Sequence, residues 1–131
     1  MNAHPNLAKI DAWIASIQGG DLEAVVDSYA EDGVYRVPGD NLVSGSFRGR
    51  DAIRDFFVHL AEVTGGTMRV EVTDRLADDD HAAMFWRLTA EREGRTLDAT
   101  GAMAFKIDAD GKFSESWFLY DDQREYDEFY S

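Results

Sequence analysis

Apolar residues recur at intervals of three and four over the first half of the chain, which is typical of helices with one buried face. A stripe from Leu7 to Ile17 predicts the first helix. A second helix is predicted to start at Asp21, whose carboxylate can accept backbone N–H bonds there. Its buried face includes Tyr29, and Gly33 ends it. The third helix is predicted over residues 50–63.

The pattern differs in the segments around and after that third helix. Residues 34–37 are predicted to form a short strand that ends at Pro38, and 40–49 a polar, glycine-rich loop. From Thr67 onward apolar residues alternate with polar ones, which is typical of strands with one buried face. The alternation predicts one strand from Thr67 and three more over 82–92, 96–107 and 112–120.

Helices followed by antiparallel strands are typical of the α+β class. The strong right-handed twist of such a sheet lets it curve around a helix and leave a hollow at its open end. We therefore expect a single domain over residues 1–131. Its predicted architecture is a cone-shaped, curved, mainly antiparallel sheet wrapped around three N-terminal helices, which is a cystatin-like or α+β-barrel arrangement. The acidic tail carries Tyr126, Phe129 and Tyr130 and is expected to pack back on it.

Hairpin geometry predicts which side chains share a face of the sheet. A two-residue turn at Glu93-Gly94 pairs Trp86 with Gly101, and a second turn at 108–111 pairs Met103 with Ser116. The face turned toward the helices then carries Met84, Trp86, Leu88, Ala99, Gly101, Met103, Ser116, Phe118 and Tyr120. From the residues alone, this set fits a densely packed core or the wall of an open pocket.

The opposite face of the sheet mixes apolar and charged residues. It carries Phe85, Arg87, Thr100, Trp117 and Leu119. Such a face is more apolar than an ordinary solvent-exposed surface and more polar than a protein core. We interpret it as a homodimer surface, with simple exposure as the alternative.

Composition narrows the possible partners. Among 131 residues there are 26 Asp and Glu against 13 Lys and Arg, a net charge of −13, so nucleic acids and anionic membranes are not expected partners. The chain has no cysteine, which excludes disulfides and thiolate sites. No apolar segment predicts a leader or a membrane span, so a cytoplasmic location is expected.

No cofactor motif is evident, and no cofactor is expected. The acidic run Asp78-Asp79-Asp80-His81 suggests a metal site at first sight. Consecutive side chains are not expected to converge on one ion, and no second cluster completes a shell, so we predict no metal.

Several segments together resemble the nuclear-transport-factor-2-like superfamily, in its SnoaL-like and ketosteroid-isomerase-like branch. These segments, in order, are Gly19-Gly20-Asp21-Leu22, Tyr29-Ala30-Glu31-Asp32, Pro38, the run from Gly49 to Phe57, and Glu115-Ser116-Trp117 with Asp121. The resemblance implies the fold described above with an internal pocket. It does not imply one activity, because this group includes isomerases, cyclases, dehydratases and hydrolases.

The positions that carry ketosteroid isomerase chemistry in that branch fall here on Trp13, Val37, Phe57 and Met103. None of these side chains can abstract or return a proton, and the indole can only donate a hydrogen bond. The resemblance therefore argues against ketosteroid isomerisation. An epoxide hydrolase of the same superfamily uses an Arg-x-Asp pair, and the corresponding segment Arg87-Leu88-Thr89 lacks the carboxylate.

The remaining candidates for chemistry are few. Tyr35, Tyr120, His59 and Asp40 are the candidate catalytic residues. The alternatives are core packing for Tyr35, a position at the boundary of the helical stripe for His59, and solvent exposure for Asp40. The pocket is predicted to be lined by the inner-face residues together with Trp13, Tyr29, Val37, Phe56 and Phe57.

Three functions follow as hypotheses. The first is a SnoaL-like protein that binds a small, mostly apolar, ring-containing molecule. The second is an isomerase, cyclase, dehydratase or hydrolase acting on a polyketide-, steroid- or terpenoid-like substrate. The third is a non-enzymatic module that dimerises through its outer sheet face. Whether the protein is an enzyme is left open.

Overall fold

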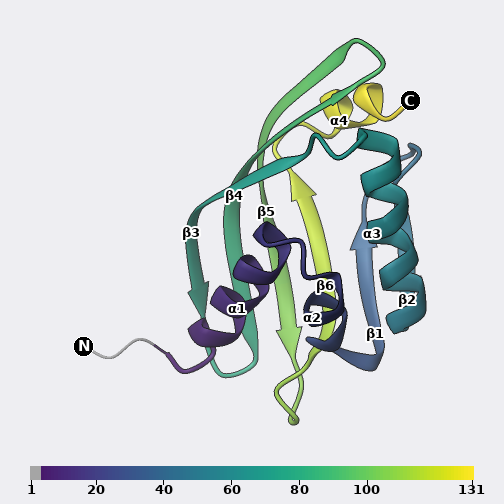
Figure 1. The fold of residues 1–131 in the computed structure, drawn as a ribbon. Helices are drawn as coiled ribbons and strands as arrows, with labels where there is room; N and C mark the ends of the chain where they lie inside the picture. The colour runs from purple at the N-terminus through teal and green to yellow at the C-terminus, as the bar shows by residue number, and fades with distance from the viewer. Residues whose placement is uncertain (1–3) are drawn as a thin grey trace.

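The computed structural model describes residues 4–131 of the chain. Within this range the chain forms four helices and six strands (Figure 1). The helices are α1 (Leu7–Gln18), α2 (Leu22–Asp27), α3 (Arg50–Thr64) and α4 (Gln123–Phe129). The strands are β1 (Tyr29–Val37), β2 (Gly45–Arg48), β3 (Arg69–Ala77), β4 (His81–Arg92), β5 (Arg95–Ile107) and β6 (Phe113–Tyr120).

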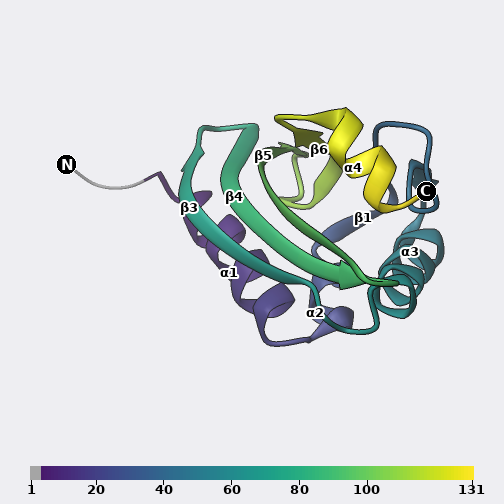
Figure 2. The same ribbon diagram turned by 90° about the horizontal axis from the view of Figure 1, so that it is seen from above.

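The six strands form one open sheet with the order β2-β1-β6-β5-β4-β3. The β1–β6 pair is parallel and every other pair is antiparallel, so the sheet is mixed. Figure 2, the view from above, shows the curvature of the long strands β3 and β4. The α+β class and the curved sheet are as predicted.

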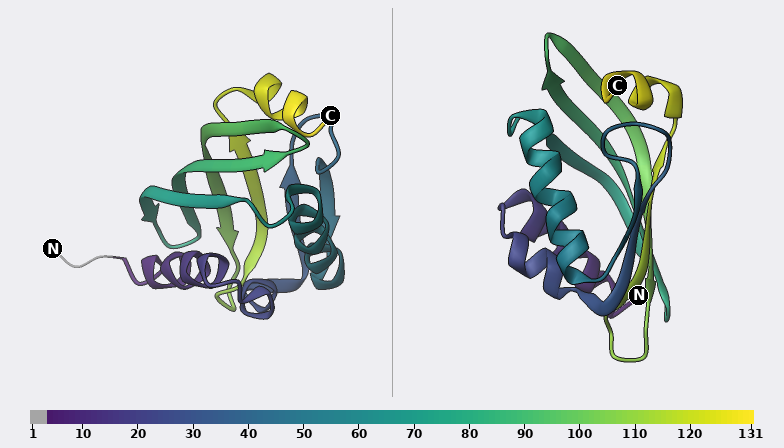
Figure 3. Two further views of the ribbon diagram at one scale, coloured as in Figure 1. Left: turned by 45° about the horizontal axis from the view of Figure 1, so that its top comes forward. Right: turned by 90° about the vertical axis from the view of Figure 1, so that its right-hand side faces the viewer.

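The helices are divided between one face and one end of the sheet. Figure 3 shows α1, α2 and α3 on a single side of the sheet, with α4 at the end of the sheet where β6 finishes. The apolar stripes of α1 and α3 are buried at Ile10, Trp13, Ile53 and Phe56. Burial of such stripes supplies most of the stability of short helices, because helices of this length are marginal alone.

The second helix is shorter than the sequence predicts. Asp21 caps it as expected, since its side chain accepts the N–H of Ala24, but α2 ends at Asp27. Tyr29 is therefore the first residue of β1 and does not lie on the helix. The apolar spacing that favours a helix at Tyr29 is overridden by strand pairing, because Tyr29 of β1 pairs with Phe113 of β6.

Two further expectations about this region were wrong. Gly33 does not end a helix but lies inside β1, at the register shift between Tyr29 and Val34. A Cβ atom at Gly33 would press on the backbone carbonyls of Ala30 and Phe113, which explains the glycine. The predicted loop over 40–49 contains the edge strand β2, whose polar sequence hides its pairing with β1.

The first predicted hairpin is confirmed. Glu93 and Gly94 have φ values of 50° and 78°, as a two-residue turn requires, and Trp86 pairs with Gly101. The second hairpin differs in register by two residues: its turn has five residues, 108–112, instead of four, and a bulge between Lys106 and Ile107 adds one more. Met103 therefore pairs with Phe118 instead of Ser116. A shift of two leaves every side chain on its predicted face, since the side-chain period of a strand is two.

The C-terminal segment packs back on the sheet as predicted. Tyr126, Phe129 and Tyr130 are buried. Polar contacts hold α4 on both sides: the Asp127 carboxylate accepts a 2.7 Å bond from the side-chain amide of Asn41, and Arg92 donates to the carbonyls of Phe129 and Ser131. Within residues 4–131, none of the helices has the length and apolar character needed to cross a bilayer.

Candidate functional site

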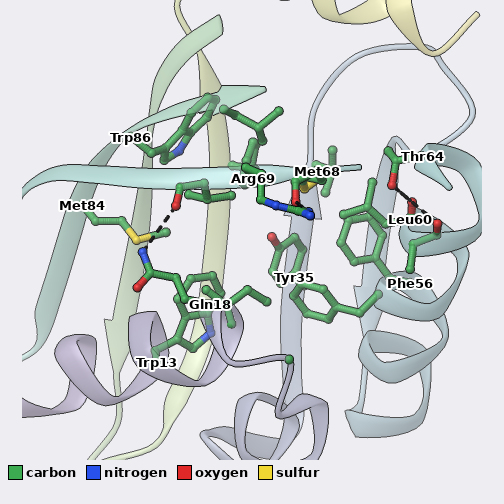
Figure 4. Close-up of a pocket in the computed structure, with 18 of the residues that line it drawn as sticks. Trp13, Gln18, Tyr35, Phe56, Leu60, Thr64, Met68, Arg69, Met84 and Trp86 are labelled. Carbon is green, nitrogen blue, oxygen red and sulfur yellow. Dashed lines mark hydrogen bonds between the residues drawn. The ribbon is translucent and has the colours of Figure 1, made fainter. Parts of the chain in front are cut away.

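A cavity of about 590 Å³ lies between the inner face of the sheet and the helices α1 and α3. Figure 4 shows its lining side chains, with Tyr35 near the centre, Trp13 and Gln18 below it, and Phe56, Leu60 and Thr64 of α3 on one side. The lining residues are Trp13, Ile17, Gln18, Gly20, Tyr35, Val37, Phe56, Phe57, Leu60, Ala61, Thr64, Gly66, Met68, Arg69, Val70, Met84, Trp86, Leu88, Phe118, Tyr120 and Tyr126.

Stacked aromatic rings form the sheet side of the cavity. The rings of Trp86 and Phe118 stack with centroids 4.8 Å apart, and those of Tyr120 and Tyr126 with centroids 3.5 Å apart. Gly101 makes the first stack possible, because a Cβ atom there would collide with the indole of Trp86. Packed aromatic rings of this kind give a wall suited to flat apolar surfaces.

Tyr35 projects from β1 into the middle of this space. Its ring packs against those of Phe56 and Phe57, at centroid distances of 4.9 and 5.3 Å. Its hydroxyl donates only a weak bond, 3.9 Å long, to the sulfur of Met103. Burial raises the pKa of Tyr35 well above its ordinary value, and the neighbouring Tyr29 and Tyr120 raise it further. The hydroxyl therefore stays protonated and acts as a hydrogen-bond donor, not as a base.

Tyr120 offers a second hydroxyl at the end of β6. It lies against Tyr126 of α4, so the C-terminal helix contributes to the same wall. Burial also raises the pKa of Tyr120. Both tyrosines that were predicted as catalytic candidates thus line the cavity as neutral phenols.

The remaining polar groups gather where α1, α3 and β3 come together. The Gln18 amide donates a 3.3 Å bond to the carbonyl of Val70, and the Thr64 hydroxyl donates a 2.9 Å bond to the carbonyl of Leu60. Arg69, the first residue of β3, is exposed and contributes the guanidinium drawn in Figure 4. These groups form a polar rim on an otherwise apolar cavity.

Among residues 4–131, no Asp, Glu or His lines the cavity. The structure places His59 on the exposed side of α3, where its Nε2 lies 3.1 Å from the carbonyl of Leu42. Asp40 is exposed, and its backbone N–H donates to Asp127. Neither reaches the cavity, because α3 turns His59 outward and the loop after β1 folds toward α4.

Five residues predicted for the pocket lie beneath its wall instead of on it. They are Tyr29, Ala99, Gly101, Met103 and Ser116. Tyr29 and Ser116 share a buried hydrogen bond of 2.8 Å, so their hydroxyls satisfy each other. Burial raises the pKa of Tyr29. These residues support the lining side chains by packing.

The structure also adds lining residues that the sequence interpretation did not select. Ile17 and Leu60 belong to the predicted helical stripes, and Met68 and Val70 to the first alternating strand, so their periodicity could have found them. Arg69 carried no such signal. Alternation puts it on the face opposite Met68 and Val70, but it begins an edge strand, where a long side chain can reach around the sheet.

The acidic turn between β3 and β4 differs in one respect from the expectation. The side-chain ligand atoms of Asp78, Asp80 and His81 do lie within 4.8 Å of one another. The Asp78 carboxylate accepts the backbone N–H groups of Asp80 and His81, and these bonds lower its pKa. The convergence is thus explained by the turn itself, and the expectation that no metal binds stays a prediction.

Comparisons with known proteins agree on the family. The family model of the SnoaL-like domain matches residues 10–116. The Uncharacterized protein Rv0034 of Mycobacterium tuberculosis is 30% identical over 123 residues, which are 93% of each chain. Bal32a, from a soil-derived mobile gene cassette, superposes with a TM-score of 0.89 at 27% identity over 96% of both chains.

Two solved structures with this fold were determined with small molecules. TerC, co-crystallized with polyporic acid, has a TM-score of 0.83 at 22% identity and covers 96% of this chain and 98% of its own. RV0760c from Mycobacterium tuberculosis, in complex with estradiol-17beta-hemisuccinate, has a TM-score of 0.72 at 18% identity and covers 87% and 92%. At these identities the likeness is one of fold.

Proposed function

The chain belongs to the SnoaL-like domain family, and from this premise we propose that it binds a small, mostly apolar, ring-containing molecule in the cavity. The observation that carries the proposal is a cavity of about 590 Å³ that has stacked aromatic walls and no carboxylate or imidazole among its described lining residues. Cavities of a few hundred Å³ with apolar walls and few polar groups are typical of small-molecule sites.

The chemistry of the wall favours binding over proton transfer. A ring inserted beside Trp86 and Phe118 would leave water and gain stacking contacts. Proton abstraction needs a base within hydrogen-bond reach of the substrate. The phenols of Tyr35 and Tyr120 stay protonated, so they can donate and accept hydrogen bonds but do not supply a base for proton abstraction.

The test is titration with N-phenyl-1-naphthylamine, a neutral two-ring dye whose fluorescence rises in apolar surroundings. Saturable binding is expected for the wild type. Leu60→Trp, which fills the cavity from α3, should weaken binding at least tenfold, on the order of 1.4 kcal/mol. Val58→Trp is the matched control, because Val58 is exposed on the same helix. Equal affinity in both variants would place the dye elsewhere and refute the proposal.

Catalysis by orientation is the second candidate function. The observation in its favour is the Tyr35 hydroxyl, whose only partner among the described residues is a weak one, the Met103 sulfur. Tyr35, with Tyr120 beside it, could hold a carbonyl or phenol oxygen of a polyketide-, steroid- or terpenoid-like substrate. Turnover of such candidates by wild type and by Tyr35→Phe tests this role, and equal rates would remove Tyr35 from it.

We also propose that the protein forms a homodimer through the outer face of the sheet. The large exposed apolar side chains on this face include Phe85 at 45% and Leu119 at 48% exposure, and Trp117 is half-buried. Burial against a second copy would remove them from water. Sedimentation should give a dimer that Leu119→Asp converts to monomer, whereas a monomeric wild type would exclude it. A cytoplasmic location stays a prediction.

A further inference from the structure

The charge of the cavity is opposite to that of the molecule. The chain carries 26 acidic and 13 basic residues, a net charge of −13. The described lining residues nevertheless contain no acid, and their one charged side chain is Arg69. A neutral ligand would not need a positive charge at the cavity, and a cationic ligand would be repelled by the guanidinium of Arg69. A positive charge at this place therefore favours an anionic ligand.

The contacts of Arg69 leave half of its guanidinium available. Its Nη1 donates to the carbonyl of Gly66 at 3.0 Å and to that of Met68 at 2.8 Å. These bonds fix the plane of the group at the connection between α3 and β3. They do not use the edge formed by Nε and Nη2, which has no hydrogen-bond partner among residues 4–131.

Three other arginines use this same edge to bind a carboxylate of the chain. Arg54, Arg75 and Arg87 each present Nε and Nη2 to the two oxygens of one acid. In the described chain no carboxylate lies within ion-pair distance, 4.0 Å, of Arg69. The same fork geometry that these three pairs use is thus open at the rim of the cavity.

We propose that Arg69 binds an anionic oxygen group of the ligand, such as a carboxylate or sulfonate, at the rim of the cavity while the rings of the ligand lie inside. The inference rests on the proposed function and narrows it to amphipathic acids. Planar guanidinium groups bind such anions through two parallel bonds from Nε and Nη2. Anchoring of Nη1 by backbone carbonyls reduces the side-chain freedom that is lost on binding.

The experiment compares two dyes that differ by one group. The anionic dye 8-anilinonaphthalene-1-sulfonate is N-phenyl-1-naphthylamine with an added sulfonate. In Arg69→Gln the affinity for the sulfonate dye should fall about tenfold, the worth of a charge-assisted hydrogen bond. The affinity for the neutral dye should change less than about twofold, because the apolar wall is intact, and this also shows that the variant folds.

Arg48→Gln is the matched control. It removes the same charge from an exposed position on β2, so it reports the effect of net charge alone. Both dyes should bind this variant as they bind the wild type. If Arg69→Gln weakens both dyes equally, or neither, the anion site is refuted while the cavity stands. If the neutral dye fails to bind the wild type saturably, the proposed function itself fails.

Discussion

The two faces of the sheet are made by the same strands, but one face is buried and the other is largely exposed. Met84, Trp86 and Leu88 of β4 are almost wholly buried, while Phe85 between them is 45% exposed. Both faces contain large apolar side chains, so hydrophobicity alone does not separate them. What separates them is the position of α1, α2 and α3, which cover one face only.

The inner face is itself divided into a filled part and a hollow part. Toward α1 and the start of β6, Trp13, Phe105 and Phe113 fill the space with ring contacts of 5.4 and 4.6 Å. Toward the start of β3 and the end of β6 the side chains leave open space and line the cavity. The same kind of residue thus serves as core at one end and as binding wall at the other.

The largest effect expected from this comparison is that of Phe105→Ala against Phe85→Ala. Phe105 is 0% exposed on the inner face, so its loss should reduce the free energy of unfolding by about 3–5 kcal/mol. Phe85→Ala, the same change on the outer face, should cost less than about 1 kcal/mol. Urea unfolding measures both. Equal losses at every protein concentration would contradict the division of faces, and a loss at Phe85 that depends on concentration would support the dimer.

A smaller effect is expected at Gly101. A valine there would press on the carbonyl of Leu119 and on the indole of Trp86, so Gly101→Val should destabilise by about 1–3 kcal/mol and shift the Trp86 ring. Ala102→Val, one residue along on the outer face, should change stability by less than about 0.5 kcal/mol. Thermal unfolding with tryptophan fluorescence follows both properties. An unchanged fluorescence in Gly101→Val would show that the stack does not depend on the glycine.

The smallest perturbation is a change of pH, which probes the inner face without mutation. Burial raises the pKa of all five tyrosines above 10, that of Tyr130 to about 12. The unfolded chain therefore loses these protons first, so stability is full below pH 10 and falls as the pH rises through 10 to 12 and above.

Tyrosinate absorbance should accordingly rise together with the loss of circular dichroism, in one transition above pH 10. In denaturant, where every hydroxyl meets water, the same absorbance should rise near pH 10. A tyrosine that titrates near pH 10 while the fold persists would show that its hydroxyl reaches solvent, and Tyr120 at the cavity would be the first candidate.

The sequence predicted the elements whose patterns are long and local. The stripes of α1 and α3 and the alternation in β4 and β5 each extend over ten or more residues, and the turn at Glu93-Gly94 sets its own register. The edge strand β2 and the start of β1 at Tyr29 were missed. The strand β2 is only four residues long and mostly polar, so it shows no alternation, and Tyr29 pairs with Phe113, which lies far along the chain.

By itself, the sequence determined the α+β class, the family resemblance and the face on which the residues of β4, β5 and β6 lie, because these follow from period and order. Only the tertiary structure decided which inner residues touch open space. Tyr29 and Met103 lie under the wall, His59 and Asp40 lie outside, and Arg69 reaches the rim from an edge strand. Such placement depends on helix orientation and sheet curvature, which arise from contacts between segments distant in sequence.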